Sequence, residues 1–185
     1  MQDFVHLHVH TQYSILDGQA SIPRLVDKAM ADGMKGIAVT DHGDMFGIKE
    51  FFNYVNKKNG KTNGEIKDLR KKIAGLEKGK VECENPEAEI AVCKEQLEAA
   101  QKKLFKPIIR CEMYVARRRL HDREKAMGDY SGYHLILLAK NIKGYKNLIK
   151  IVSKGYTEGF YGRPRTDRVE LEKYHEGLVC CSACI

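Results

Sequence analysis

Apolar and polar residues alternate close to the start of the chain. Three histidines, His6, His8 and His10, occupy alternate positions, and Val or Leu stands between them. A period of two is typical of a β-strand, in which successive side chains point to opposite faces. We therefore predict a strand over residues 4–9, with its apolar face packed into a core and its other face carrying the three imidazoles.

Short apolar runs of this kind recur and alternate with helical patterns. Helices are expected from Ser21 to about Asp32, around 48–55 and around 145–152, because apolar residues recur there at helical spacing. The other predicted strands are residues 35–40, 107–115, 133–139 and 178–182. Strand–helix repetition implies an α/β fold with parallel strands and right-handed crossovers, either a doubly wound sheet or a β/α barrel.

Residues 60–105 interrupt this alternation. One narrow apolar seam runs through 66–76 and a second through 90–104, both with heptad-like spacing. Asn85 and Pro86 form a typical helix start between them. The pattern predicts two antiparallel helices in a coiled-coil-like hairpin, inserted into the domain and separate from its functional site.

Length and composition indicate the broad class of protein. The chain has 185 residues, enough for one domain with a buried core. No apolar run reaches ~18 residues, and the N-terminus lacks the regions of a secretory signal, so we expect a cytoplasmic protein. Six cysteines without disulfide-framework spacing agree with a reducing compartment. Cys180 and Cys181 are expected to be buried in their strand.

The net charge of +7 is unevenly distributed. Residues 106–175 hold sixteen Lys and Arg but only eight Asp and Glu. A local excess of this kind favours a phosphate-rich partner, such as a nucleic acid or a nucleotide, although a merely solvated basic surface explains it equally well.

Each predicted strand carries a potential metal ligand near one end. In parallel β/α folds these ends share one edge, where reactive groups gather. The candidates are His8, His10, Asp17, His42, Glu112, His134 and Cys184. His6 lies farther from its strand end than His8 and His10. Asp41 is better placed to orient the neighbouring His42, or to cap the helix that follows, than to bind a metal.

This mixture of ligands indicates the type of metal. Imidazole with carboxylate suits Zn²⁺, Mn²⁺ or Fe, whereas Mg²⁺ and Ca²⁺ prefer oxygen ligands alone. The candidates are too numerous for one ion, so we predict a cluster of two or three ions with Glu112 as a bridging carboxylate. Two metals roughly 3.5–4 Å apart can polarise a phosphoryl oxygen and activate water.

Several short motifs occur in a familiar order. They are His8-Val9-His10-Thr11, Leu16-Asp17-Gly18, Thr40-Asp41-His42-Gly43, the 107–112 strand, Tyr133-His134-Leu135 and Ser182-Ala183-Cys184. With these motifs the chain resembles the PHP (polymerase and histidinol phosphatase) domain family. Segments 137–141 and 159–165 bring it nearest to the PHP domains that open the α subunits of bacterial DNA polymerase III.

The resemblance implies a distorted β/α barrel of seven strands with a three-metal cleft. Residues 1–185 would form the N-terminal part of such a domain and supply five strands, with 60–105 as the inserted helical hairpin. The family's metal ligands match His8, His10, Asp17, His42, Glu112, His134 and Cys184. Zn or Mn is expected, with Fe or Mg as alternatives. Two further ligands, an Asp and a His, belong to a late strand that the chain does not include. Arg110 stands where the family usually has Gly, and Ala183 also replaces a usual Gly.

The resemblance also implies a function. It is that of a metal-dependent phosphoesterase within a replicative DNA-directed DNA polymerase, acting as a 3′-5′ exonuclease on DNA 3′ ends or on pyrophosphate. His8, His10, Asp17, His42, Glu112 and His134 would be catalytic. The expected partners are DNA, the remainder of the α subunit and a separate proofreading exonuclease. Without the late ligands, the fragment is expected to have little or no activity.

Arginines and aromatic residues cluster near the end of the basic region. Arg163 and Arg165 stand next to Phe160 and Tyr161. Arginine matches phosphate bidentately and aromatic rings can stack a base, so these two arginines are candidates for gripping a phosphodiester.

Two other functions remain open. The domain could be a structural module that supports the polymerase and docks a proofreading exonuclease, with metals that only stabilise the fold. It could also be a small-molecule hydrolase of the amidohydrolase kind, which uses a His-x-His on its first strand. That class requires a carbamylated lysine on a middle strand, and none is evident.

Overall fold

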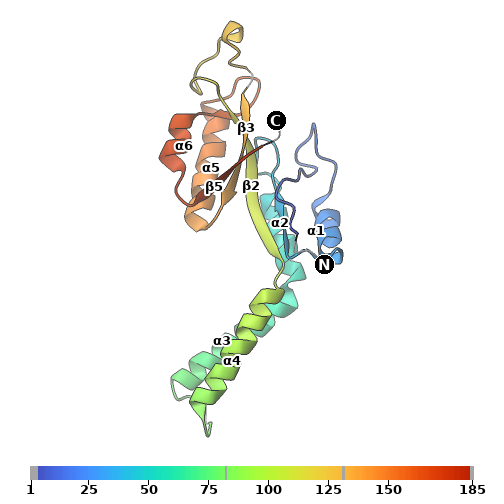
Figure 1. Ribbon diagram of the computed structural model, residues 1–185, viewed down its shortest axis with the longest axis vertical. Coiled ribbons are helices and arrows are strands. Elements are labelled where there is room, and N and C mark those ends of the chain that lie inside the picture. The colour runs from blue at the N-terminus through green and yellow to red at the C-terminus, as the bar shows by residue number, and fades with distance from the viewer. Residues whose placement is uncertain (1–3, 82, 131, 184–185) are drawn as a thin grey trace. The chain divides into compact units, whose positions relative to one another are not determined.

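A computed structural model describes residues 4–81, 83–130 and 132–183 (Figure 1). The chain divides into two compact units. One comprises Met1–Phe52 with Pro107–Ile185, and the other comprises Asn53–Lys106. Within the described part of the chain, no helix has the length and apolar character needed to cross a membrane.

A five-stranded sheet forms the centre of the first unit. Its strands are β1 (Gly36–Val39), β2 (Lys106–Val115), β3 (Tyr133–Ala139), β4 (Arg165–Thr166) and β5 (Leu178–Ser182). The order across the sheet is β1-β2-β3-β5, and β4 pairs with β2 in parallel. β3 runs antiparallel to both β2 and β5.

The prediction of parallel strands throughout is therefore wrong. A parallel crossover usually contains a helix, whereas the described part of the connection from β2 to β3 contains only the short 3₁₀ helix η1 (Lys125–Met127). Without a covering helix the chain returns antiparallel. The sheet is mixed, and its closure into a barrel stays a prediction.

Residues 4–10 do not form the predicted first strand. The amide of Ala38 donates to the His6 carbonyl at 3.0 Å, and the amide of Thr40 donates to the Val9 carbonyl at 2.8 Å. The donor follows its acceptor by 32 residues in the first bond and by 31 residues in the second. The pairing of this segment with β1 therefore slips by one residue, and no regular ladder forms. Leu7, expected in the core, is 46% exposed.

Among the described residues, four α-helices belong wholly or partly to the first unit. They are α1 (Ile22–Ala31), α2 (Ile48–Lys58), α5 (Ile142–Thr157) and α6 (Arg168–Tyr174). The predicted positions of the first three are confirmed. The side chain of Asn141 caps α5 by accepting a hydrogen bond from the Gly144 amide, and that of Asp167 caps α6 in the same way.

Helix α5 covers one face of the sheet and thereby defines the other. Its Leu148 and Ile151 pack against Cys111 and Met113 of β2 in one buried cluster. Because side chains alternate along a strand, the residue between these two, Glu112, points to the opposite face. The functional candidates of β2 lie on that second face.

The second unit is built mainly from two helices, α3 (Gly60–Glu77) and α4 (Pro86–Lys103), which pack side by side (Figure 1). Buried residues of the two seams include Ile66, Ile73 and Cys93. The Asn85 side chain caps α4 by accepting a hydrogen bond from the Ala88 amide, as its position before Pro86 predicts.

Candidate metal centre

Glu112 occupies the middle of the candidate site and is held there by its backbone. Its amide donates to the Asp41 carbonyl at 3.2 Å, and its carbonyl accepts from the Gly43 amide at 2.7 Å. These bonds join β2 to the loop that follows β1. The Glu112 side chain is only 1% exposed, so its carboxylate faces the protein interior.

Four imidazoles surround this carboxylate. His8 Nε2 lies 2.6 Å and His10 Nε2 3.3 Å from Glu112 Oε2. On the other oxygen, His134 Nδ1 lies 3.0 Å and His42 Nε2 3.8 Å from Oε1. The side chains therefore form two groups that share Glu112, His8–His10–Glu112 and His42–Glu112–His134, and within each group the possible ligand atoms lie within 4.8 Å of one another.

Asp17 joins the second group from the loop after His10. Its Oδ2 lies 2.9 Å from His42 Nδ1 and 4.0 Å from His10 Nε2, and Ser14 donates a hydrogen bond to its other oxygen. The hydrogen bonds from Ser14 and His42 outweigh partial burial and lower the pKa of Asp17. Asp17 is thus an ionised carboxylate next to both groups.

Asp41 has a different role from the expected one. Its carboxylate accepts hydrogen bonds from the Thr11 amide at 2.6 Å and from the Thr11 hydroxyl at 2.9 Å. Asp41 therefore anchors the segment after His10 and does not orient His42. The partner of His42 Nδ1 is Asp17.

Electrostatics keep Glu112 charged. Burial by itself would raise its pKa, but hydrogen bonds with His10 and His8 and the nearby His42 lower the pKa of Glu112 to about 2. The hydrogen bond to Glu112 raises the pKa of His10, whereas burial and the neighbouring His42 lower the pKa of His134. The neutral imidazole of His134 is the form that binds a metal.

The arrangement of unpaired ring nitrogens fits a cation. Among the described residues, the buried Nε2 of His42 and the buried Nδ1 of His10 have no hydrogen-bond partner. His42 Nε2 belongs to the group formed with Glu112 and His134, and a metal ion would use its lone pair. Imidazole with carboxylate suits Zn²⁺ or Mn²⁺.

Tyr114 and Arg163 lie next to the candidate ligands. The Tyr114 ring stacks on the His42 ring with centroids 4.4 Å apart, and Arg163 Cζ lies 4.8 Å from the Tyr114 centroid. Arg163 is exposed, as a phosphate-binding side chain must be. Tyr114 was absent from the sequence-based candidates, although it stands two positions after Glu112 and so shares its strand face.

Arg165 does not fit the expected phosphate contact. It is 1% exposed, and its guanidinium donates to four backbone carbonyls, those of Leu120, Asp122, Asp129 and Gly159. Four hydrogen bonds, out of five N–H groups, therefore join Arg165 to loops of the fold and not to a phosphate. Arg163 lies in the bend before β4, whereas Arg165 is the first residue of that strand, and their residue type and spacing do not indicate that only Arg165 is enclosed.

His6, Cys180 and Cys181 belong to neither of the two groups. Cys184 falls outside the described residues. His6 is exposed, and its ring meets the edge of the Phe4 ring. Cys180 is exposed and Cys181 only half-buried, so the expectation of buried strand cysteines is wrong. Their strand, β5, is the last in the sheet order.

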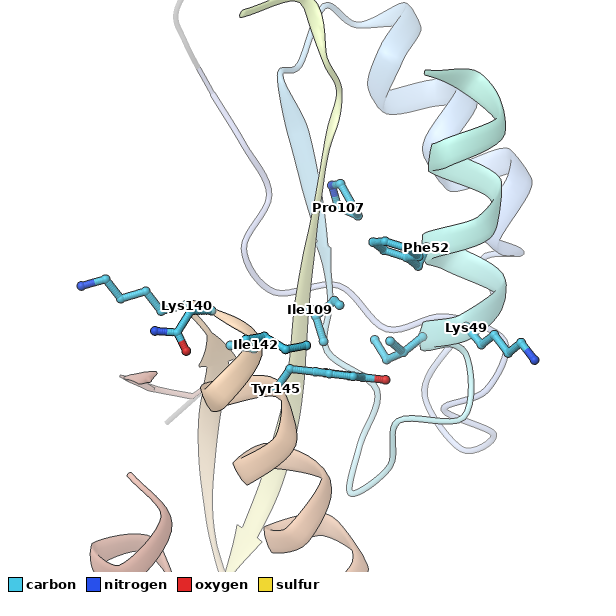
Figure 2. A pocket seen from close by; sticks show the side chains of 10 residues that line it. Lys49, Phe52, Pro107, Ile109, Lys140, Ile142 and Tyr145 are labelled. Atoms are coloured by element: carbon cyan, nitrogen blue, oxygen red, sulfur yellow. The ribbon is translucent and has the colours of Figure 1, made fainter. Parts of the chain in front are cut away.

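A cavity of about 500 Å³ lies on the side of the sheet that α5 covers, away from the candidate metal ligands (Figure 2). Apolar side chains line it, among them Phe52 of α2, Ile109 of β2 and Ile142 of α5. Figure 2 shows the Phe52 ring near Pro107 and the Tyr145 ring extending from α5. Ile109 and Glu112 point to opposite faces of β2, so this cavity is separate from the candidate centre.

The model of the PHP domain family matches residues 6–185. The chain belongs to the PHP domain family. DNA polymerase III subunit alpha of Borreliella burgdorferi is 40% identical over 183 residues, which are 98% of this chain and 12% of that protein. The subunits of the same name from Aquifex aeolicus and Thermus aquaticus are 35% and 34% identical over 189 and 185 residues, covering 100% and 98% of this chain and 12% of each protein.

These matches confirm the resemblance that the motifs indicate, and the mixed α/β sheet agrees with a PHP-type fold. This chain spans only 12% of the length of each of these three relatives.

Proposed function

We propose that this chain is the N-terminal PHP domain of a DNA polymerase III α subunit, and that its Glu112 centre binds two or three Zn or Mn ions. In the complete polypeptide, further strands would close the sheet into a distorted β/α barrel, and residues 60–105 would form a helical hairpin inserted into it. The identity of 34–40% with three polymerase subunits supports this assignment.

One observation carries the proposal of a multinuclear centre. Glu112 takes part in two separate groups of possible ligands, one through each carboxylate oxygen. Two ions held close together by these residues would stabilise the attacking and the leaving oxygen in phosphoester hydrolysis. His8 and His10 would hold one ion, and His42 and His134 the other, with Asp17 beside both.

The proposed reaction is hydrolysis of a phosphodiester at a DNA 3′ end, or of pyrophosphate. When bound, the metal ions would supply Lewis-acid activation of the phosphoryl group and of water. Glu112 stays ionised and holds in place the four imidazoles of the two groups. Asp17 accepts a hydrogen bond from His42 Nδ1 and so determines which ring nitrogen of His42 faces the centre. The exposed guanidinium of Arg163 would bind a phosphate of the substrate.

Tyr114 would serve as a positioning residue. Its ring contacts His42, a proposed ligand, and Arg163, the proposed phosphate-binding residue. Loss of the ring would let both side chains adopt other rotamers. Tyr114 would thus affect metal binding and substrate binding without contacting the metal or the substrate.

The proposed partners are DNA, the remainder of the α subunit and a separate proofreading exonuclease. The excess of positive charge in residues 106–175 supports a nucleic-acid partner. Part of that charge is neutralised within the fold, since Arg118 pairs with Asp129 and Arg119 with Asp167.

The test uses the longer polypeptide that includes the late-strand ligands. It should retain two or three equivalents of Zn or Mn and trim single-stranded DNA 3′ ends, and His10→Ala should abolish both. His121→Ala, at an exposed histidine, should change neither. Parallel assays with pyrophosphate identify the substrate. Metal-free protein with full stability and no trimming would refute the hydrolase and leave the scaffold function.

A further inference from the structure

Arg110 is a buried cation on the same strand face as Glu112. The two residues are separated by two positions on β2, so their side chains point to the same side of the sheet. Arg110 is 1% exposed and ranks among the largest fully buried side chains. A guanidinium removed from water in this way is costly unless an anion or several acceptors compensate it.

The compensation is incomplete within the described residues. Arg110 forms no ion pair there, and its Nε and Nη2 atoms have no hydrogen-bond partner. Cys181 of β5 is the side chain that faces this guanidinium. A thiol is a weak acceptor and leaves at least two of the five N–H groups unsatisfied.

The surface beside Arg110 is open. Arg110 pairs with Leu138 of β3, which in turn pairs with Val179 of β5, so these three side chains share one face of the sheet. Val179 is 43% exposed, and Cys181 on the same face is half-buried. β5 has one neighbour, β3, among the strands of the described sheet, which leaves its other edge without a strand partner. An apolar strip therefore borders an unsatisfied guanidinium.

We propose that Arg110 forms a buried ion pair with a carboxylate carried by an apolar segment of the longer polypeptide, which packs over β3 and β5. This inference rests on the proposed function, because it takes the chain to continue as in relatives of which it spans 12%. A carboxylate accepts a bidentate pair of hydrogen bonds from guanidinium, which matches the two unpaired nitrogens. The exposed Val179 supplies the apolar contact for the same segment.

A first experiment measures thermal unfolding of the 185-residue chain with a chelator present, so that metal binding does not contribute. Arg110→Met should raise the unfolding midpoint by roughly 3 °C or more, because it removes an uncompensated buried charge while preserving volume. Arg168→Met, at an exposed arginine, is the matched control and should have little effect. A fall in the midpoint of Arg110→Met would show that the guanidinium is already satisfied and would overturn the proposal.

A second experiment repeats the substitution in the longer polypeptide, where the sign should reverse. Arg110→Met should now lower the midpoint, and Arg110→Lys should lower it as well because an ammonium cannot replace a bidentate pair. The same rise with Arg110→Met in both chains would overturn the proposed ion pair with a carboxylate of the longer polypeptide. Neither readout depends on metal content or DNA trimming, which test the proposed function separately.

Discussion

Glu112 Oε1 lies 3.0 Å from His134 Nδ1, although the two residues are on different strands and separated by the connection from β2 to β3. Glu112 is paired with Ile136 in the register, so His134 is its diagonal neighbour on the same face. The antiparallel pairing of β2 and β3 thus brings Glu112 and His134 of the second group of candidate ligands together.

This relationship predicts that the two metal positions can be separated by mutation. With Mn²⁺, the wild-type centre should give the electron paramagnetic resonance signal of two spin-coupled ions. His134→Ala should remove one ion and leave the signal of a single Mn²⁺, because His8, His10 and Glu112 remain. His175→Ala, at an exposed histidine, should retain the coupled signal. A single-ion signal in the wild type would contradict a bridging role for Glu112.

Arg163 is predicted to contribute one phosphate contact to DNA binding. Arg163→Met should weaken binding of single-stranded DNA and reduce the slope of log affinity against log salt concentration by about one, with metal content unchanged. Fluorescence anisotropy across a salt series measures both quantities. Arg168→Met removes an equally exposed charge that is paired with Glu172, so equal slopes for the two variants would show only a general charge effect.

Two helical glycines should respond in opposite directions to alanine. A Cβ at Gly144 of α5 would lie 1.8 Å from the Gly177 carbonyl oxygen, so Gly144→Ala should lower the free energy of unfolding by about 2 kcal/mol or more. Gly64 of α3 has no neighbouring atom within 4 Å of that position, so Gly64→Ala should raise it by about 1 kcal/mol. Urea denaturation of both variants checks this. A Gly144→Ala variant as stable as wild type would contradict the packing of α5 against the turn at Gly177, and destabilisation by Gly64→Ala would contradict the open surroundings of Gly64.

Asp129 gives the fold a defined dependence on pH. Its carboxylate accepts two hydrogen bonds from the Arg118 guanidinium, which hold the pKa of Asp129 at about 2. A lowered carboxyl pKa stabilises the folded state above the ordinary value of 3.8, and this contribution disappears as pH falls from about 4 to about 2. Asp129→Asn should therefore be less stable than wild type at pH 7, with the difference vanishing near pH 2.

Urea denaturation at several pH values measures this difference. Asp68→Asn, at an exposed carboxylate of α3, should show no such trend. A stability difference for Asp129→Asn that stays constant from pH 7 to pH 2 would attribute the effect to packing and exclude the ion pair with Arg118.

Local patterns predicted most helices and the later strands because short-range spacing determines them. The caps at Asn85 and Asn141 illustrate this, since each side chain reaches an amide only three residues away. The predicted direction of β3 was wrong, because the direction of a strand depends on the whole connection that precedes it. The strand predicted around His6 and His8 does not form because the pairing of this segment with β1 slips by one residue, and no local sequence pattern indicates such a slip.

In the candidate site, too, local sequence pattern identified some residues correctly but could not predict contacts with distant segments. Glu112, His8, His10, His42 and His134 could be chosen from residue type and strand position, and all five lie together. Arg165 could not be separated from Arg163 by sequence, because the difference depends on carbonyl groups of loops 36 to 45 residues away that enclose only Arg165.

The central claim is that Glu112 organises a metal centre, and metal analysis tests it most directly. The 185-residue chain, dialysed first against Zn²⁺ or Mn²⁺ and then against metal-free buffer, should retain metal when measured by mass spectrometry. Glu112→Gln should lose it, whereas Glu98→Gln, at an exposed carboxylate of α4, should retain it. Retention of equal metal by Glu112→Gln, or none by the wild type, would contradict the account.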